Sequence, residues 1–97
     1  MGVPMKVHVR FFAYLAETVG RKEKFEIGIE EGSTVTHLVK LLTHDSRVKK
    51  GMLDENNALK PDVTILKNGR EIKFLSGMET LLEPGDEISI FPPVVGG

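Results

Sequence analysis

Apolar and polar residues alternate in three stretches of the chain with the two-residue period of a β-strand. In residues 6–12, 24–29 and 88–91, every second side chain is apolar and the side chains between them are mostly polar. Phe12 and Phe91 are exceptions, because each falls among the polar positions of its stretch. We therefore predict three strands that each bury one face, and we expect the first two to pair as a hairpin.

Residues 32–42 follow a different pattern, in which apolar side chains recur every three or four positions. This spacing is that of an amphipathic α-helix whose apolar face is formed by Val35, Leu38, Val39 and Leu42. Ser33 or Thr34 can serve as the N-cap, because a side-chain oxygen there accepts a hydrogen bond from the first turn. A shorter helical turn is predicted at residues 13–18, before Gly20. We expect the apolar face of the longer helix to cover the sheet.

The clearest turn signal lies in the second half of the chain, at Asn68-Gly69. Two runs of strand-forming residues meet there within residues 62–74, and both turn residues tolerate the positive φ angles of a type I′ turn. This pattern predicts strands three and four. Leu81 and Leu82 then anchor a short crossing, and a turn at residues 84–86 leads into the last strand.

The stretch between the main helix and this hairpin, residues 43–61, is polar and irregular. Gly51 and a proline interrupt it, and its apolar side chains are scattered, at Val48, Met52, Leu53 and Leu59. We interpret this stretch as a surface connection with one short helical turn.

The order of elements is strand, strand, helix, strand, strand, strand. This order indicates an α+β fold with one main helix packed across a mixed five-stranded sheet. The 97 residues, 40% of them hydrophobic, suffice for one core, so we predict one domain over residues 1–91 and an extended tail over residues 92–97. A formal net charge of -1 and the lack of a long basic cluster argue against partners such as nucleic acid or a membrane. Without a signal-peptide pattern or a long apolar run, we expect a cytoplasmic protein.

Reactive side chains are sparse in this sequence. It contains no cysteine, which excludes a disulfide framework, a thiolate metal site and a cysteine nucleophile. His8, His37 and His44 fit no zinc signature, and no glycine-rich phosphate motif is present, so we expect no directly bound cofactor or metal. The acidic pairs at residues 30–31 and 86–87 lie in predicted turns, where we interpret them as solvated carboxylates.

Two aromatic residues break the polar side of their strands. If the first and last strands are parallel neighbours, Phe12 and Phe91 project together near the carboxyl ends of these strands. An apolar patch on a charged face is typical of a partner surface, and the alternative is that a loop covers the two rings.

The chain ends in FPPVVGG. Pro92 and Pro93 have restricted φ angles and cannot donate to a sheet, so the last strand must stop before them. The chain must then leave the domain as a stiff, extended neck. Gly96 and Gly97 have no side chains that could collide with the walls of a narrow channel. The alternative is an ordinary frayed end, although such an end needs neither a stiff base nor a bare tip.

The element order and this ending together resemble the ubiquitin-like β-grasp sulfur carriers of the MoaD/ThiS family, in particular the small subunit of molybdopterin synthase. The resemblance covers nearly the whole chain. VRFFAYLAETVG matches the family's first strand and turn, LEPGDEISIFPPV matches its last turn and strand, and GG matches its modified terminus. The chain differs from short family members by extra residues around positions 49–61.

The resemblance implies that the chain is not an enzyme but the sulfur-carrier subunit of a sulfurtransferase complex. An E1-like adenylyltransferase would use ATP-Mg to convert the Gly97 carboxylate into an acyl-adenylate, and a persulfide sulfur donor would then supply the sulfur of a thiocarboxylate. The tail would enter the large subunit of molybdopterin synthase, within a heterotetramer, and donate sulfur to cyclic pyranopterin monophosphate. The residues that would contact these partners are Phe12, Phe91, Pro92, Pro93, Val94, Val95 and Gly96.

Other functions remain open at the level of the sequence. A ubiquitin-like protein modifier would use the same Gly97 to form isopeptide bonds with lysines. A sulfur carrier of the thiamine pathway or of tRNA thiolation would share the terminal glycines. A plain β-grasp binding module would have an inert tail and would keep its activity without Gly96 and Gly97.

Overall fold

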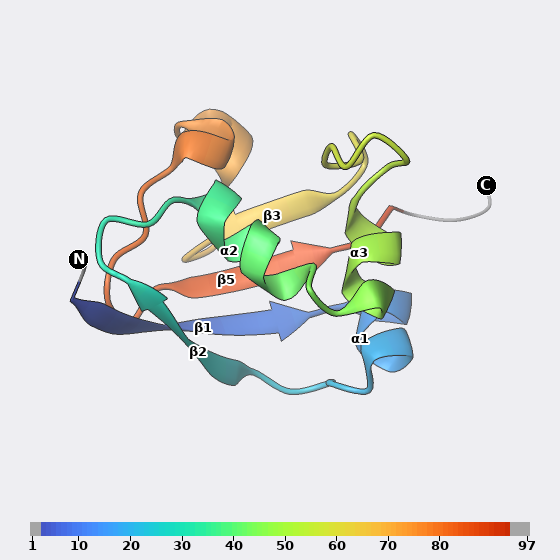
Figure 1. Ribbon diagram of the computed structural model, residues 1–97, viewed down its shortest axis with the longest axis horizontal. Helices are drawn as coiled ribbons and strands as arrows, with labels where there is room; N and C mark the ends of the chain where they lie inside the picture. The colour runs from blue at the N-terminus through green and yellow to red at the C-terminus, as the bar shows by residue number, and fades with distance from the viewer. Residues whose placement is uncertain (1–2, 94–97) are drawn as a thin grey trace.

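Between residues 3 and 93, five strands form one mixed sheet. The computed structural model describes residues 3–93 (Figure 1), and its strands are β1 (Pro4–Phe11), β2 (Phe25–Glu30), β3 (Thr64–Lys67), β4 (Arg70–Glu71) and β5 (Glu87–Phe91). They lie in the order β2-β1-β5-β3-β4, so the first and the last strand are neighbours. β1 and β5 are parallel, and the other neighbouring strands are antiparallel. The predicted mixed sheet and the pairing of the first two strands are confirmed.

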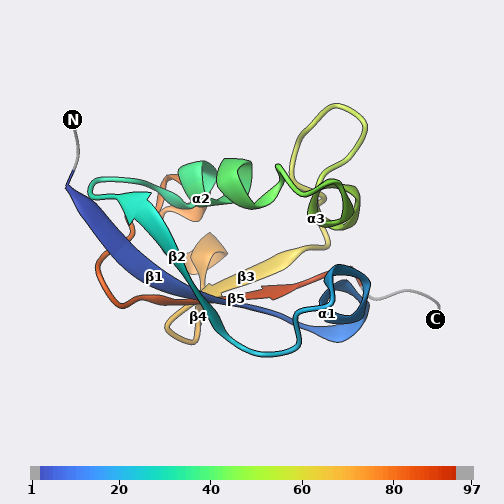
Figure 2. The same ribbon diagram turned by 60° about the horizontal axis from the view of Figure 1, so that its bottom comes forward.

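In the part of the chain that the structure describes, three α-helices connect the strands, namely α1 (Ala13–Val19), α2 (Val35–Leu42) and α3 (Ser46–Met52). Two short 3₁₀ helices, η1 (Ile72–Phe74) and η2 (Gly77–Glu79), follow the β3–β4 hairpin. α2 and α3 lie on the same side of the sheet (Figure 2). α1 and α3 both lie at the end of the sheet toward which β1 and β5 point (Figure 1).

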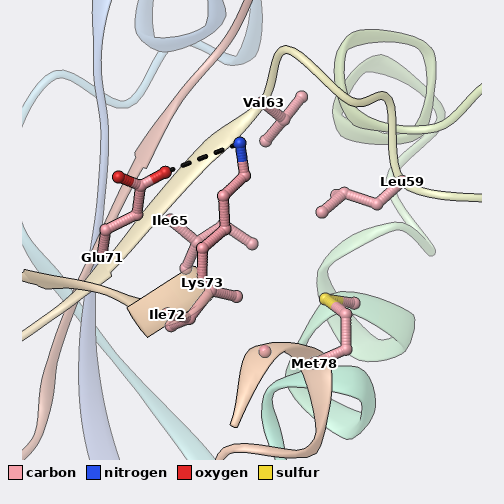
Figure 3. Close-up of a pocket in the computed structure, with 8 residues that line it drawn as sticks. Leu59, Val63, Ile65, Glu71, Ile72, Lys73 and Met78 are labelled. Atoms are coloured by element: carbon pink, nitrogen blue, oxygen red, sulfur yellow. Dashed lines mark ion pairs between the residues drawn. The ribbon is translucent and has the colours of Figure 1, made fainter. Parts of the chain in front are cut away.

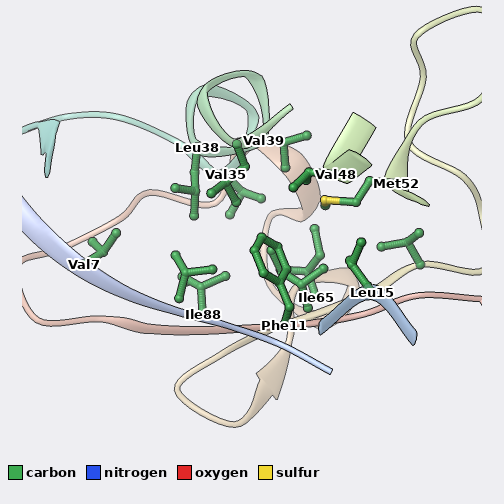
Figure 4. Packing of buried hydrophobic residues seen from close by; sticks show 14 of the residues in the cluster. Val7, Phe11, Leu15, Val35, Leu38, Val39, Val48, Met52, Ile65 and Ile88 are labelled. Atoms are coloured by element: carbon green, nitrogen blue, oxygen red, sulfur yellow. The ribbon is translucent and has the colours of Figure 1, made fainter. Parts of the chain in front are cut away.

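The hydrophobic core lies between α2, α3 and the inner face of the sheet (Figure 4). As the helical spacing predicts, α2 buries its whole apolar face. The alternating positions of β1 and β5 are buried opposite it, since side chains two residues apart share one face of a strand. The most deeply buried side chains of the core include Val7, Val9, Phe11, Leu15, Val35, Leu38, Met52, Ile65, Ile88 and Ile90.

The start of α2 is fixed by hydrogen bonds within its first turn. Thr34, one of the two predicted N-cap residues, precedes the helix in an extended conformation. The Nδ1 atom of His37 accepts a hydrogen bond from the backbone N–H of Thr34 at 2.9 Å. This contact satisfies a backbone donor that the start of a helix leaves without a partner. His37 therefore has a structural task here.

The predicted hairpin turn is present, but the strand after it is short. Asn68 and Gly69 have φ angles of 50° and 85°, which are the positive values that a type I′ turn requires. β4 ends at Glu71, whereas the sequence predicts a strand that reaches residue 74. The chain turns into η1 instead, which buries Ile72 in the core and leaves Phe74 82% exposed.

The stretch after α2 contains a short helix, as predicted, but this helix packs into the core and is not the surface connection that the sequence indicates. Residues 46–52 form α3, and its Val48 and Met52 side chains are only 2% and 0% exposed. Asp45 is the N-cap of this helix, because its carboxylate accepts a hydrogen bond from the Arg47 N–H at 2.8 Å. Gly51 permits the close approach of α3 to α1, since a Cβ atom there would lie 2.8 Å from Cδ1 of Leu15.

Two further residues differ from their predicted environments. Asp86 was predicted to be solvated, but it is only 6% exposed. Its carboxylate accepts hydrogen bonds from the Glu83 N–H at 2.8 Å and from Nδ2 of Asn68 at 2.9 Å, so the buried charge is satisfied. Leu82 anchors the crossing before β5 with a buried side chain, as predicted, whereas the side chain of Leu81 is 59% exposed and only its backbone pairs, with Thr34.

Within residues 3–93, the helices are too short or too polar to cross a lipid bilayer.

Candidate functional site

The parallel pairing of β1 and β5 brings Phe12 and Phe91 together. The N–H of Phe12 donates to the Ile90 carbonyl at 3.0 Å, which extends the β1–β5 register by one residue. The two rings lie 4.3 Å apart, centroid to centroid, and are nearly parallel, with an angle of 13° between their planes. We call Phe12 and Phe91 the aromatic pair. The condition stated from the sequence, that these strands are parallel neighbours, is met, and each ring is half-buried.

The aromatic pair lies on the outer face of the sheet, opposite the helices. Its neighbours on both strands, Phe11 and Ile90, point into the core and are 2% and 0% exposed. On β3, Thr64 is paired with Phe91 in the antiparallel register, so its side chain lies on the same face. Leu66, two residues further along β3, is also half-buried on this face and extends the apolar surface.

Arg10 is a further member of this site, and the sequence analysis did not single it out. Its guanidinium carbon lies 4.9 Å from the centroid of the Phe12 ring, in the geometry of a cation–π contact. A signal was available, because Arg10 and Phe12 are two residues apart on one strand and therefore share a face. A shallow surface depression next to these residues is also lined by Glu17 and Lys22.

The rest of the outer face carries paired charges. Nζ of Lys6 and Nε2 of His8 lie 3.8 Å and 4.0 Å from the Glu26 carboxylate. Nζ of Lys24 lies 3.5 Å from the Glu87 carboxylate. These contacts are solvent-exposed and contribute little to stability individually.

The three histidines lie in three different places. His8 is on the outer face of β1, His37 is in the first turn of α2, and His44 follows α2 at the surface. Among residues 3–93, no cluster of three histidine, cysteine, aspartate or glutamate side chains is arranged to hold a metal ion.

The base of the tail follows directly from the aromatic pair. β5 ends at Phe91, as the two prolines predict, and Pro92 is buried while Pro93 is half-buried. The neck is therefore held against the domain at Pro92. The predicted site residues Val94, Val95, Gly96 and Gly97 lie outside the described residues, and their roles stay predictions, as do the partner contacts of the residues before them.

A small pocket elsewhere in the domain makes a poor alternative site. It has a volume of about 110 Å³ and lies between the β3–β4 hairpin, η2 and Leu59 (Figure 3). Its walls are mostly apolar, and its charged rim is formed by Lys73 and Glu71, whose Nζ and carboxylate oxygen are 3.7 Å apart. Pockets for small-molecule substrates typically measure about 300–1,000 Å³, so this pocket is too small for most of them.

One ion pair at the start of α3 has a clear electrostatic effect. The Arg47 guanidinium and backbone N–H donate hydrogen bonds to Asp45, and they lower the pKa of that carboxyl from 3.8 to about 2. The same contact raises the pKa of Arg47. This pair caps α3 and is exposed, so we assign it a structural task.

Comparisons with known proteins agree with the arrangement described above. The sequence model of the ThiS family matches residues 9–97 of this chain. Small archaeal modifier protein 3 of Haloferax volcanii is 41% identical over 93 residues, which cover 96% of this chain and 100% of that protein. The solution structure of the Haloferax volcanii HVO 2177 protein has a TM-score of 0.81 and 37% identity, and the match covers 97% of this chain and 88% of that one. A Pyrococcus furiosus structure, provisionally named molybdopterin converting factor, subunit 1, has a TM-score of 0.70 and 29% identity, with 93% and 99% of the two chains covered.

Proposed function

The chain belongs to the ThiS family of ubiquitin-like β-grasp sulfur carriers and modifiers, and on this premise we propose that its reactive group is the C-terminal carboxylate of Gly97. The predicted ubiquitin-like β-grasp fold is confirmed by the similar solved structures. Small carriers of this kind are generally non-catalytic. We propose that the catalytic side chains belong to partner proteins and that this chain supplies the group on which they act.

The observation that carries this proposal is that the family match continues to residue 97. A match confined to the folded domain would support the fold alone, whereas this one includes both terminal glycines. The strand that leads to them ends at Phe91, and Pro92 is held against the domain. The last described residues thus form a fixed base, and the sequence beyond them ends in two glycines that have no side chains.

Activation of this carboxylate requires a good leaving group. A carboxylate oxygen of Gly97 attacks the α-phosphorus of ATP, pyrophosphate leaves, and an acyl-adenylate forms. A nucleophile then attacks the acyl carbon and AMP leaves. An E1-like adenylyltransferase with ATP-Mg is the partner that this chemistry calls for, and the absence of a side chain at Gly96 and Gly97 lets the reacting carbon enter a confined site.

The nucleophile in the second step decides the function. We propose that it is the ε-amine of a lysine, which forms an isopeptide bond and makes this chain a protein modifier. The full-length similarity to a small archaeal modifier protein supports this choice over the small subunit of molybdopterin synthase that the sequence alone favours.

Sulfur transfer is the second candidate. A persulfide attacks the acyl-adenylate to give an acyl disulfide, and a second thiol then cleaves the S–S bond and leaves a thiocarboxylate on Gly97. The similarity to the Pyrococcus furiosus structure, at 29% identity, supports delivery of this sulfur to a pterin within molybdopterin synthase. The two functions are compatible, because both begin from the same acyl-adenylate.

We propose that the aromatic pair is the surface on which these partners dock. Phe12 and Phe91 present stacked apolar rings next to the base of the tail, so a protein that covers them also receives the tail. Partly exposed aromatic side chains surrounded by charges are typical of the central residues of protein interfaces.

Exchange of labelled pyrophosphate into ATP tests the first chemical step. We expect the full chain to support exchange with the E1-like adenylyltransferase of its own organism, and we expect no exchange with a variant that lacks Gly96 and Gly97. An Ala variant of Lys40, an exposed residue of α2, serves as a matched control and should behave like the parent. Exchange by the truncated chain would contradict the proposal.

Experiments in cells with an N-terminally tagged chain distinguish protein modification from sulfur transfer. Modifier function predicts tagged conjugates of higher mass in which mass spectrometry finds branched peptides that link Gly97 to lysine side chains. Molybdopterin function predicts that deletion of the gene abolishes pterin sulfuration and that the full chain restores it. Conjugates that persist without Gly96 and Gly97 would contradict a role of the terminal carboxylate in modification.

A further inference from the structure

We propose that Arg10 forms an ion pair with an aspartate or glutamate of the activating enzyme and thereby orients this chain on it. The inference rests on the proposed function and adds a chemical description of the partner. The surface that covers the aromatic pair should be apolar at its centre, and it should place a carboxylate against the guanidinium of Arg10.

The position of Arg10 supports this inference first. Arg10 is exposed, while Phe12 is half-buried beside it on the outer face of β1. The guanidinium carbon lies 4.9 Å from the centroid of the Phe12 ring. The cation–π contact keeps the guanidinium beside the ring, and the N–H donors of a guanidinium form a fork that can bind both oxygens of a carboxylate. A partner that covers Phe12 must therefore also contact this charge.

The charges around Arg10 supply the second argument. By register, the nearest outer-face position on β5 is Ser89, which carries no charge. The carboxylate of Glu87 is within ion-pair distance of Lys24, and that of Glu26 is within ion-pair distance of Lys6. Both outer-face carboxylates near Arg10 are thus already engaged by other cations. Among residues 3–93, no carboxylate lies within 4.0 Å of the Arg10 guanidinium.

The depression beside Phe12 also carries an excess of positive charge. Arg10 and Lys22 bring two positive charges to its wall, and Glu17 brings one negative charge. A docked surface that buried Arg10 without a counter-charge would lose the hydration of the guanidinium, which is costly. Charge complementarity therefore favours an acidic side chain at this point of the partner.

An exposed charge at the edge of an apolar contact acts chiefly on the rate of association and on its salt dependence. Reversal of the charge in Arg10→Glu should lower the association rate constant at low salt by about 10-fold, the lower end of the usual range for electrostatic steering. High salt should reduce the difference, since screening weakens the attraction in the parent and the repulsion in the variant. Arg10→Lys keeps the charge but loses the fork, so its rate should fall between those of the parent and of Arg10→Glu.

The test uses the full chain and the purified E1-like adenylyltransferase of the same organism. The association rate constant is measured by stopped-flow at low and at high salt, and the catalytic efficiency of pyrophosphate exchange is measured alongside. Arg70→Glu is the matched control, because Arg70 is exposed on β4, which β3 and β5 separate from β1. Circular dichroism checks that each variant keeps the parental fold.

The outcomes separate this inference from the proposed function. Slower association of Arg10→Glu than of Arg70→Glu at low salt, with a smaller difference between the two rates at high salt, supports the ion pair. Equal association rates of these two variants with an enzyme that activates the parent would overturn the role of Arg10 and leave the role of Gly97 intact. An enzyme that does not activate the parent would overturn the proposed function and, with it, the inference.

Discussion

The two faces of strands β1 and β5 differ in how far their apolar side chains are buried. On the inner face, Phe11 and Ile90 are 2% and 0% exposed and belong to the core. On the outer face, one residue away on each strand, the aromatic pair is half-buried and stacks on itself. A strand separates the two sets because its side chains alternate. Substitutions on the inner face should therefore change the free energy of unfolding, and those on the outer face should change binding to partners.

The largest effect on stability is expected at the inner layer. Leu38 lies on the apolar face of α2 and is 0% exposed. Leu38→Ala removes buried methyl groups and leaves a cavity, so it should lower the free energy of unfolding by about 2–5 kcal/mol. Urea unfolding followed by circular dichroism measures the change. Leu41→Ala, on the exposed side of the same helix, is the control and should cost much less.

Substitution in the aromatic pair should change partner binding more than it changes the free energy of unfolding. Phe12→Ala should weaken binding to the activating enzyme by about 2 kcal/mol or more, as central aromatic residues of interfaces do. Its cost in stability should stay near the roughly 0.5–1.5 kcal/mol that an aromatic pair contributes beyond its buried area. Isothermal titration and urea unfolding give the two numbers.

Phe74→Ala is the matched control for this variant. Phe74 is 82% exposed and lies on η1, away from the aromatic pair. If its removal weakens binding as much as Phe12→Ala does, the docking surface is not the one that we propose.

Asp86 is charged, but we expect it to contribute to stability as the buried residues of the inner face do. Asp86→Ala leaves the Glu83 N–H and the Asn68 side chain without their acceptor. It should lower the free energy of unfolding by about 1–3 kcal/mol. The neighbouring Glu87→Ala affects only an exposed ion pair and should stay within about 0.5 kcal/mol of the parent. Equal costs in urea unfolding would show that the burial of Asp86 contributes nothing.

The smallest effect is expected at Asp45 and is visible only in acid. Arg47 lowers the pKa of Asp45 from 3.8 to about 2, so the folded state binds this proton more weakly than the unfolded state. The stabilisation is present above pH 3.8 and is lost as the pH falls through about 2. Asp45→Asn keeps an N-cap side chain but lacks the charge. Its deficit in unfolding free energy at neutral pH should shrink toward zero at a pH of about 2, and a constant deficit would contradict this sign.

Local patterns predict most of this fold. The strands, the main helix and the turn at Asn68 follow from side-chain periodicity and from backbone preferences, which act between residues close in sequence. The parallel pairing of β1 and β5 brings Phe12 and Phe91 together; from the sequence this contact is conditional on the pairing, because side-chain alternation does not set the strand order.

The misses depend on contacts between distant residues. α3 contains a glycine and few apolar side chains, so the local pattern predicts only a short helical turn at the surface and not a buried helix. Burial of Val48 and Met52 stabilises the helix, and Gly51 lets it approach Leu15 on α1; neither contact is visible in a local pattern. Asp86 lies in a turn sequence typical of solvated residues, but its acceptor capacity is used by Asn68, which is 18 positions away. Arg10 was overlooked although its spacing from Phe12 was visible, because a lone charge on an outer face usually has no special task.

The intact mass of the chain after incubation with its E1-like adenylyltransferase and ATP-Mg tests the central claim most directly. In the presence of a persulfide donor and a reducing thiol, exchange of one oxygen for sulfur on Gly97 should raise the mass by about 16 Da. With an amine in place of the donor, the same carboxylate should form an amide, and fragment ions should locate either change at the last residue. An unchanged mass with an enzyme shown to be active on another carrier, or a change located anywhere but Gly97, would contradict the account.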